Sequence, residues 1–311
     1  MKKLISVVLP CHNEAENITG LVPEIITEIP DIYDYEIILV DDGSDDDTYK
    51  VINKLGSKNR NVKGITFYKR FGHQAALLAG IRESKGDAVI TLDADYQHPP
   101  SYIPKMLQLW ENRYDLILMQ KKVYQEKEII NFFFRKAGYA LWKVVSEGVL
   151  TPGVSEFRLM DKSIKKFILK NKESQIFLRG IVSLAAKNPV MLPYTVGKRK
   201  FGDSSYNFWV NKDLFITGLI SFSTKPLRIA TYAGLLLGVS AAVFLIVDFL
   251  SAIYKGRRLI EGYLTIVFLL LILNGFQIFF MGILGEYLGV IFKEVKKRPP
   301  YIIKERVNSG K

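Results

Sequence analysis

Residues 88–100 read Ala88-Val89-Ile90-Thr91-Leu92-Asp93-Ala94-Asp95-Tyr96-Gln97-His98-Pro99-Pro100, a short apolar run that ends abruptly in two carboxylates one residue apart. Turn-forming residues follow, so the pattern predicts a buried strand that stops at the edge of a sheet and carries a site there. Asp93 and Asp95 are hard oxygen ligands, and Mg²⁺ is usually bound by one or two carboxylates together with substrate phosphates. The alternative, for an Asp-x-Asp taken alone, is that Asp95 only caps the helix that follows.

Short runs rich in β-branched residues alternate with segments of helical periodicity along the N-terminal half of the chain. This alternation predicts an α/β fold with an open, mostly parallel sheet, whose ligands bind beyond the carboxyl ends of the strands. Asn13, Asp41, Gly72 and Asp93 all follow predicted strands at that edge. The predicted strands are residues 4–9, 36–40, 62–68, 88–92 and 115–119, and the predicted helices include 14–28 and 75–83.

The composition narrows the classes of partner. The 311 residues carry a formal net charge of +12, which predicts anionic partners such as nucleic acid, phosphorylated small molecules or an anionic membrane face. The single cysteine, Cys11, excludes an intramolecular disulfide, and the three histidines have no zinc-ligand spacing. The sequence contains no Gly-x-Gly-x-x-Gly after a strand and no Gly-x-x-x-x-Gly-Lys, so it offers neither a dinucleotide fingerprint nor a P-loop.

Two long apolar segments predict a membrane hairpin near the C-terminus. Residues 229–254 and 264–284 are each long enough to cross a hydrocarbon layer of roughly 30 Å, which takes about 20 residues of helix. Basic residues flank the pair, so the positive-inside rule predicts a cytoplasmic domain before it and a cytoplasmic tail after it, although the short loop between the spans is basic too. Contact with anionic headgroups explains much of the positive charge, and we expect no nucleic-acid partner.

The chain is therefore predicted to have three parts: a cytoplasmic domain (1–226), two transmembrane helices (227–290) and a basic cytoplasmic tail (291–311). Within the domain, residues 129–147 interleave bulky apolar and aromatic side chains with basic ones, which predicts a helix at the membrane surface. An ordinary buried amphipathic helix is the alternative for this segment. Residues 211–223 are a second candidate for a membrane-surface helix.

A series of short motifs gives the chain a family resemblance over nearly its whole length. It resembles the family 2 GT-A glycosyltransferases in PCHNE (10–14), VDDGS (40–44), RFGHQA (70–75) and DADYQHPP (93–100). It resembles more narrowly the polyprenyl-phosphate glycosyltransferases, the branch that contains dolichol-phosphate mannose synthase and the bactoprenol glucosyltransferases, in EFRLMD (156–161), SFSTKPLR (221–228), GEYLG (285–289) and KRPPY (297–301). The resemblance implies a GT-A catalytic domain, Rossmann-like with flanking helices, followed by a two-helix transmembrane hairpin.

The resemblance also implies a nucleotide-sugar site at the strand ends. The implied residues are Pro10, Asn13, Glu14, Asp41, Asp42, Arg70, Gly72, Gln74, Asp93 and Ala94. For Asp41 and Asp42 the alternative is structural, as turn and helix-cap residues before Gly43 and Ser44. Asp93 and Asp95 would hold Mg²⁺ or Mn²⁺ on the diphosphate, where the ion neutralises charge on the departing nucleotide.

On the acceptor side, the resemblance implies Asp95 and Glu156 as catalytic residues, because Glu156 stands where relatives have a carboxylate proposed as a base. A phosphate acceptor is already largely anionic near neutral pH, so both a base and a purely orienting group stay open for Glu156. The residues implied to grip the acceptor phosphate are Lys122, Arg135, Arg199 and Ser204. Ser205 stands where the family usually has a lysine.

The activity implied by the resemblance is inverting transfer of a hexose from a nucleotide sugar, expected to be UDP-glucose or another UDP-hexose, to undecaprenyl phosphate in a bacterial inner (plasma) membrane. A flippase and a downstream transferase would use the product, and the resemblance is compatible with a homo-oligomer such as a tetramer. A processive polysaccharide synthase is the enzymatic rival, but the chain lacks a Gln-x-x-Arg-Trp motif and further spans. The rival from another class is a catalytically silent membrane scaffold or sugar-nucleotide sensor.

Overall fold

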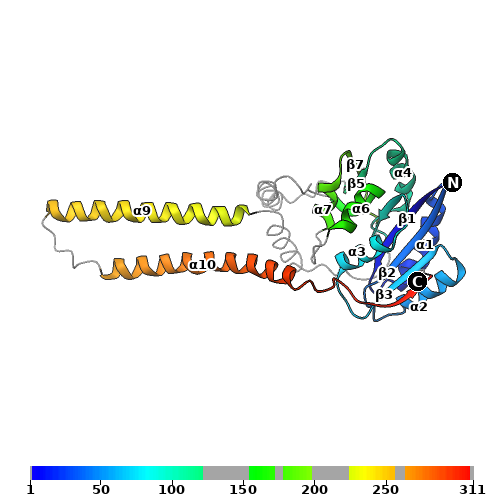
Figure 1. Ribbon diagram of the computed structural model, residues 1–311, viewed down its shortest axis with the longest axis horizontal. Helices are drawn as coiled ribbons and strands as arrows, with labels where there is room; N and C mark the ends of the chain where they lie inside the picture. Colours follow the sequence, from blue (N-terminus) through cyan, green and yellow to red (C-terminus); the bar gives the residue numbers. More distant parts are fainter. Residues whose placement is uncertain (1, 122–153, 172–177, 198–223, 256–262, 309–311) are drawn as a thin grey trace.

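The computed structural model of the protein describes residues 2–121, 154–171, 178–197, 224–255 and 263–308. In these parts the chain forms an α/β domain and two long helices that extend from it (Figure 1). The centre of the domain is an eight-stranded sheet of order β7-β5-β6-β4-β1-β2-β3-β8. Its strands are β1 (Lys3–Cys11), β2 (Tyr33–Asp41), β3 (Val62–Phe67), β4 (Ala88–Thr91), β5 (Leu116–Lys121), β6 (Val154–Asp161), β7 (Pro189–Tyr194) and β8 (Ile303–Val307). The helices are α1 (Ala15–Glu28), α2 (Thr48–Lys58), α3 (His73–Glu83), η1 (Pro100–Tyr102), α4 (Ile103–Glu111), α6 (Lys162–Lys170), α7 (Leu178–Ala185), α9 (Lys225–Lys255) and α10 (Tyr263–Val295).

The central strands are buried on both faces of the sheet. In β1, Val7 and Leu9 belong to a core cluster that includes Leu21 of α1, whereas Val8 belongs to a second cluster with Leu77 of α3. Successive side chains of a strand point to opposite faces, so a strand covered on both sides needs a nearly unbroken apolar sequence. This requirement explains the continuous apolar runs from which the strands were predicted.

The α/β class with flanking helices is confirmed, and all five predicted strands are present. The central strands β4, β1, β2 and β3 pair in parallel as expected. The sheet as a whole is mixed, because β6 lies antiparallel between β4 and β5. The strands β6, β7 and β8 were not foreseen. The proposed membrane-surface segments 129–147 and 211–223 lie outside the described residues.

The C-terminal tail contributes an edge strand to the domain. β8 pairs antiparallel with β3, with Thr66 opposite Glu305. The chain therefore leaves the domain, passes through α9 and α10, and returns to the same sheet (Figure 1). In sequence this strand is dominated by lysine, glutamate and arginine, which is common for an edge strand because charges discourage pairing with other chains.

The two long helices are apolar and expose that apolar surface. Leu227–Ser251 and Ile272–Val295 have mean hydropathies of 2.3 and 1.6, and neither segment is buried within the molecule. Both are long enough to cross a bilayer. An unburied apolar surface of this size needs a partner or a lipid environment, so these helices indicate a membrane protein.

A buried ion pair lies among β1, β2 and β3. The Glu36 carboxylate, 4% exposed, contacts Lys63 Nζ and accepts hydrogen bonds from Ser6 Oγ and the Lys85 amide. Burial alone would raise the pKa of Glu36, but these donors outweigh burial and lower the pKa. A buried charge that loses its partner is strongly destabilising, so Glu36 and Lys63 should be a stability determinant.

Glu36→Gln is expected to lower the free energy of unfolding by roughly 2–3 kcal/mol at pH 7, because it leaves the Lys63 ammonium without its counter-charge. Since the folded-state pKa of Glu36 lies below its ordinary value of 4.5, its charge stabilises the fold above about pH 4.5, and this contribution is lost as the pH falls through the folded-state pKa. The difference between wild type and variant should therefore shrink below about pH 4.5. Thermal unfolding of the full-length protein in detergent at several pH values, followed by near-ultraviolet circular dichroism, measures this difference in stability.

Glu111→Gln is the matched control, because the Lys3–Glu111 pair is largely exposed. An exposed pair contributes about 0–1 kcal/mol. Equal effects of the two substitutions, or a Glu36→Gln effect independent of pH, would contradict the stabilising role of Glu36.

Candidate active site at the carboxyl edge of the sheet

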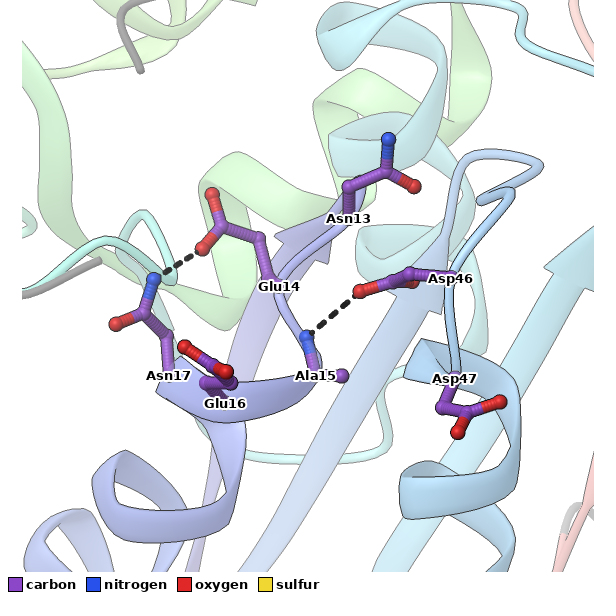
Figure 2. A pocket seen from close by; sticks show the side chains of 7 residues that line it. All are labelled: Asn13, Glu14, Ala15, Glu16, Asn17, Asp46 and Asp47. Carbon is purple, nitrogen blue, oxygen red and sulfur yellow. Dashed lines mark hydrogen bonds between the residues drawn. The ribbon is translucent and has the colours of Figure 1, made fainter. Parts of the chain in front are cut away.

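The predicted nucleotide-site residues gather where β1, β2 and β4 end. Pro10 lies near the end of β1 opposite Val40, and Cys11 lies opposite Asp41. A pocket of about 550 Å³ lies at this edge. Figure 2 shows the side chains that line it, which come from the beginnings of α1 and α2. Its lining consists of Asn13, Glu14, Ala15, Glu16, Asn17, Asp46 and Asp47. Two of the predicted residues, Asn13 and Glu14, therefore border an open pocket.

The turn after β1 is held by the turn after β2. Asn13 has a left-handed backbone with φ of 57°, and its amide donates to Ser44 Oγ at 2.9 Å. In return the Asp45 amide donates to Asn13 Oδ1 at 2.9 Å, and the Glu14 amide donates to Thr48 Oγ1. A non-glycine residue at positive φ is strained and tends to mark functional sites. These hydrogen bonds hold the loops after β1 and β2 together, so that they form one wall of the site.

Asp41, the last residue of β2, and Asp42 both accept structural hydrogen bonds. Asp41 Oδ1 accepts from the Ser44 amide at 2.9 Å, and the Asp42 carboxylate accepts from the amides of Phe71 (2.6 Å) and Gly72 (2.9 Å). Asp41 thus has the turn role that the sequence raised as an alternative, whereas the hydrogen bonds of Asp42 hold the loop after β3. Burial raises the pKa of Asp42 even though the two amides lower it.

Glycines allow the loops after β2 and β3 to meet. Gly43 has φ of +64°, and a Cβ there would lie 2.5 Å from the Lys69 carbonyl carbon. Gly72 has φ of +98°, with open space around its Cβ position. Gly72 is thus required by backbone conformation immediately before α3. Arg70, in the loop after β3, is exposed, and its charge partly offsets the rise in the pKa of Asp42 that burial causes.

Two histidines fix Asp93 beyond the end of β4. His73 Nε2 lies 2.8 Å from Asp93 Oδ1, and His98 Nδ1 accepts a hydrogen bond from the Asp93 amide at 2.9 Å. Burial alone would raise the pKa of Asp93, but the nearby His98, His73 and Arg179 hold it well below its ordinary value. Burial lowers the pKa of His98, although the charges of Asp93 and Asp95 raise it. His98 also stacks on Phe157, so the loop that carries the aspartates is anchored in the core.

The second aspartate of the motif sits in a strained turn. Asp95 is 8% exposed, and its Oδ1 accepts from the Gln97 amide at 3.0 Å. Tyr96 has φ of 65°, unusual for an aromatic residue. Gly197 crosses this turn so closely that a Cβ would lie 2.2 Å from the Tyr96 carbonyl oxygen. Ala94, between the two aspartates, is buried, so the backbone that carries both carboxylates is packed against the core.

Glu156 occupies the neighbouring strand and is surrounded by donors. It lies near the start of β6, the strand beside β4, and Thr91 Oγ1 of β4 donates to its backbone carbonyl. Its carboxylate accepts from Gln74 Nε2 at 3.1 Å and Arg179 Nε at 2.5 Å, and it pairs with the Arg158 guanidinium. Burial lowers the pKa of Arg158 to about 9. Glu156, 4% exposed, therefore links three side chains from β6, α3 and α7.

The carboxylates after β4 fit a divalent ion that shares its coordination with a substrate. Among the described residues, no group of three or more His, Cys, Asp or Glu side chains is arranged to hold a metal ion. A hard cation such as Mg²⁺ or Mn²⁺ can be held by one or two carboxylates when phosphate oxygens complete its shell. Asp93 and Asp95 supply oxygen donors of this kind, whereas a closed zinc site would need more ligands.

The structure thus brings together Asn13, Asp41, Asp42, Gly72, Gln74, Asp93, Asp95 and Glu156 around one edge. The predicted acceptor residues Lys122, Arg135, Arg199 and Ser204 lie outside the described residues. Sequence reasoning assigned no role to His73, His98, Arg158 or Arg179. The histidines stand inside recognised motifs and could have been included, whereas nothing local marks Arg179, which reaches Glu156 only through the packing of α7.

Comparison with known proteins agrees with this geometry. Residues 6–163 match the family described as Glycosyl transferase family 2, and residues 225–291 match the family described as GtrB C-terminal hairpin. The prophage bactoprenol glucosyl transferase homolog of Escherichia coli K12 is 33% identical over 96% of this chain and 98% of its own length. The bactoprenol glucosyl transferase of Shigella phage SfX is 33% identical over 97% of this chain and 99% of its own length.

Among solved structures, glucosyl-3-phosphoglycerate synthase from Mycobacterium tuberculosis, crystallised with Mn²⁺, UDP-glucose and glycerol 3-phosphate, has a TM-score of 0.52 and 18% identity. The similarity covers 71% of this chain and 80% of that one, and it confirms the GT-A-like fold of the domain. With a domain match over half of the chain and relatives similar over nearly its full length, this protein belongs to glycosyltransferase family 2 and carries the GtrB-type C-terminal hairpin.

Proposed function

We propose that this chain transfers a hexose from a nucleotide sugar, expected to be a UDP-hexose such as UDP-glucose, to undecaprenyl phosphate. The observation that carries the proposal is similarity over nearly the whole chain, hairpin included, to proteins named bactoprenol glucosyl transferases. A soluble acceptor would not require a membrane hairpin. The reaction would be a single displacement, in which a phosphate oxygen of the lipid attacks the anomeric carbon and the nucleoside diphosphate leaves with inversion.

The candidate site is suited to hold the donor. Asp93 and Asp95 would share a divalent metal ion, Mg²⁺ or Mn²⁺, with the diphosphate, and the fold neighbour crystallised with Mn²⁺ and UDP-glucose is in keeping with this. When bound, such an ion neutralises charge on the departing nucleotide. The walls formed by Asn13, Glu14, Asp41 and Asp42 would then face the nucleoside, with Pro10, Arg70, Gly72, Gln74 and Ala94 completing the proposed donor site.

We assign Glu156 an orienting role in the proposed reaction. Its Oε1 accepts hydrogen bonds from Arg179 and Gln74, and its Oε2 lies against the Arg158 guanidinium. The attacking phosphate monoester, with a second pKa of about 6, is mostly dianionic near neutral pH and needs no strong base. The barrier is then lowered chiefly by holding donor and acceptor in line. Glu156 would do this by fixing Arg179 and Gln74 beside the metal site.

The hairpin would place this site at the cytoplasmic face of the bacterial inner membrane. β8, which follows the second long helix, pairs with β3, which precedes the first, so the domain and the tail lie on one side of any membrane that the helices cross. Basic residues next to both helices favour the cytoplasmic side. Lys122, Arg135, Arg199 and Ser204 remain the predicted contacts of the lipid phosphate, and a homo-oligomer, a flippase and a downstream transferase remain predicted partners.

The proposed function is tested by transfer of radiolabel from a panel of UDP- and GDP-sugars to undecaprenyl phosphate, with the full-length protein in detergent and Mg²⁺ or Mn²⁺. One labelled lipid that disappears with EDTA is expected. Nucleotide binding without transfer from any donor would instead support the scaffold or sensor, and a growing polymer would support a processive synthase.

Asp95→Ala is the inactive control for this assay. If an ion at Asp95 contributes several kcal/mol of charge stabilisation, the rate should fall about a thousandfold. Glu16→Ala, a change at an exposed acidic residue of the neighbouring pocket, should keep most of the activity. Near-normal transfer by Asp95→Ala would contradict the metal assignment without contradicting the reaction class.

Glu156→Gln separates an orienting residue from a base. The amide keeps the shape and can still accept a hydrogen bond from Arg179, but it loses the charge that holds both arginines. We expect kcat to fall about a hundredfold, as for a misplaced substrate, with an unchanged pH dependence of kcat/KM. If the acidic limb of the wild-type profile disappears in the variant, Glu156 is a general base and the assignment is wrong.

A further inference from the structure

The segment after α10 is tied into the catalytic domain along its length. The Tyr68 amide donates to the Ile302 carbonyl at 3.2 Å, where β8 begins to pair with β3. Near its other end, Asn308 Nδ2 donates to the backbone carbonyls of Gly56 (2.6 Å) and Val62 (3.0 Å). These bonds at both ends hold the tail in one register against the sheet.

Tyr301, just before β8, begins a row of aromatic rings that leads toward the site. Its ring stacks on Phe67 with centroids 5.0 Å apart and an interplanar angle of 10°. Phe67 is buried and meets Phe71 edge-on, with centroids 5.7 Å apart. The Arg82 guanidinium lies 5.7 Å from the Tyr301 ring and adds a cation–π contact. The row connects the tail with the β3–α3 loop, residues 68–72.

The far end of this row is part of the candidate site. The Phe71 amide donates to Asp42 at 2.6 Å, and two residues later His73 contacts Asp93 at 2.8 Å. Gly72, at φ of +98°, is the only residue between them and makes the turn. A shift of the Phe71 ring would therefore move the backbone that holds both carboxylates.

Tyr301 does not contribute to the pairing of the sheet edge, so its contact with Phe67 needs a separate explanation. The paired residues of the tail are Ile303 to Val307, so Tyr301 lies outside the strand and contributes a ring instead of ladder bonds. It also lies in the short link, residues 296–302, between α10 and β8. The neighbouring Ile302 is 49% exposed, so apolar character alone does not bury a residue of this link.

We propose that Tyr301 is a positioning residue for the donor side of the site: through Phe67 and Phe71 it fixes the β3–α3 loop and thereby the Asp42 and His73 contacts. The tail after the second long helix is then required for binding the nucleotide as well as for folding of the sheet edge. The inference rests on the proposed function only for the identity of the donor nucleotide.

The test compares full-length wild type with Tyr301→Ala in detergent. Amide hydrogen exchange of Phe71 and Gly72 should become about two- to tenfold faster, because an aromatic pair of this kind stabilises its partners by that factor. UDP affinity, measured calorimetrically with Mn²⁺, should weaken by a similar factor. In the transfer assay the donor KM should rise while the KM for undecaprenyl phosphate stays constant.

Two variants serve as controls. Tyr301→Phe keeps the stacked ring and should restore wild-type exchange and UDP affinity. Ile302→Ala removes an exposed apolar side chain from the same link and should leave both unchanged. If Tyr301→Ala accelerates exchange equally in β1 and β4, the substitution has destabilised the whole domain. Tyr301→Leu, which keeps an apolar side chain without a flat ring, then replaces it in the exchange and UDP-affinity measurements.

Unchanged exchange at Phe71 and Gly72 in Tyr301→Ala, or faster exchange with unchanged UDP affinity, would overturn the positioning role. These outcomes are distinct from failure of the proposed function. A wild-type protein that binds UDP but transfers no sugar would contradict the proposed reaction, while the exchange and affinity comparisons would still decide the role of Tyr301.

Discussion

Burial of carboxylates at one edge of the sheet is the constraint on which the site depends. Parallel strands end together, so the acidic residues that follow β2 and β4 are crowded into a region with little water. Asp41, Asp42 and Asp95 are each less than 9% exposed. A buried carboxylate is costly unless donors surround it, and here the donors are loop amides and side chains from other elements. Satisfying these charges therefore dictates the shapes of the loops after β1, β2, β3 and β4.

The same constraint separates two kinds of carboxylate. Asp42 and Glu156 are engaged by donors of the protein itself, so their charge is used to hold loops and arginines in place. Asp93 and Asp95 stand on a turn strained at Tyr96 and anchored by His98, beyond the end of the strand. A strained turn fixed by its surroundings is typical of a functional site. We place the metal and diphosphate at Asp93 and Asp95 because both stand on this fixed turn at the strand end, and we give Glu156 an orienting task because two arginines surround its carboxylate.

The central strands could be predicted because burial on both faces of the sheet requires a nearly continuous apolar run. Such runs, for example residues 4–9 and 36–40, can be read directly from the sequence. The strands β6 and β8 lack this signal. β6 carries Glu156 and Arg158 toward a site, and β8 reads as a charged tail because it lies at an edge. These segments are strands because they pair with strands distant in the sequence, and the local sequence does not predict that pairing.

The site shows a similar division. Asp93 and Asp95 could be predicted because a strand end and a paired carboxylate coincide within a few residues. Arg179 and Tyr301 could not, because each acts through a contact with a residue more than twenty positions away, Glu156 and Phe67 respectively. The second role of Asp42, as an acceptor for the loop after β3, likewise depends on a contact between two turns.

The measurement that tests the account most directly is a structure of the full-length protein with Mn²⁺ and UDP, in which anomalous scattering locates the ion. The account predicts one Mn²⁺ peak within about 2.2 Å of an Asp95 oxygen, shared with the diphosphate. Mn²⁺ bound instead among Glu14, Glu16, Asp46 and Asp47, or UDP bound away from Asp93 and Asp95, would contradict it.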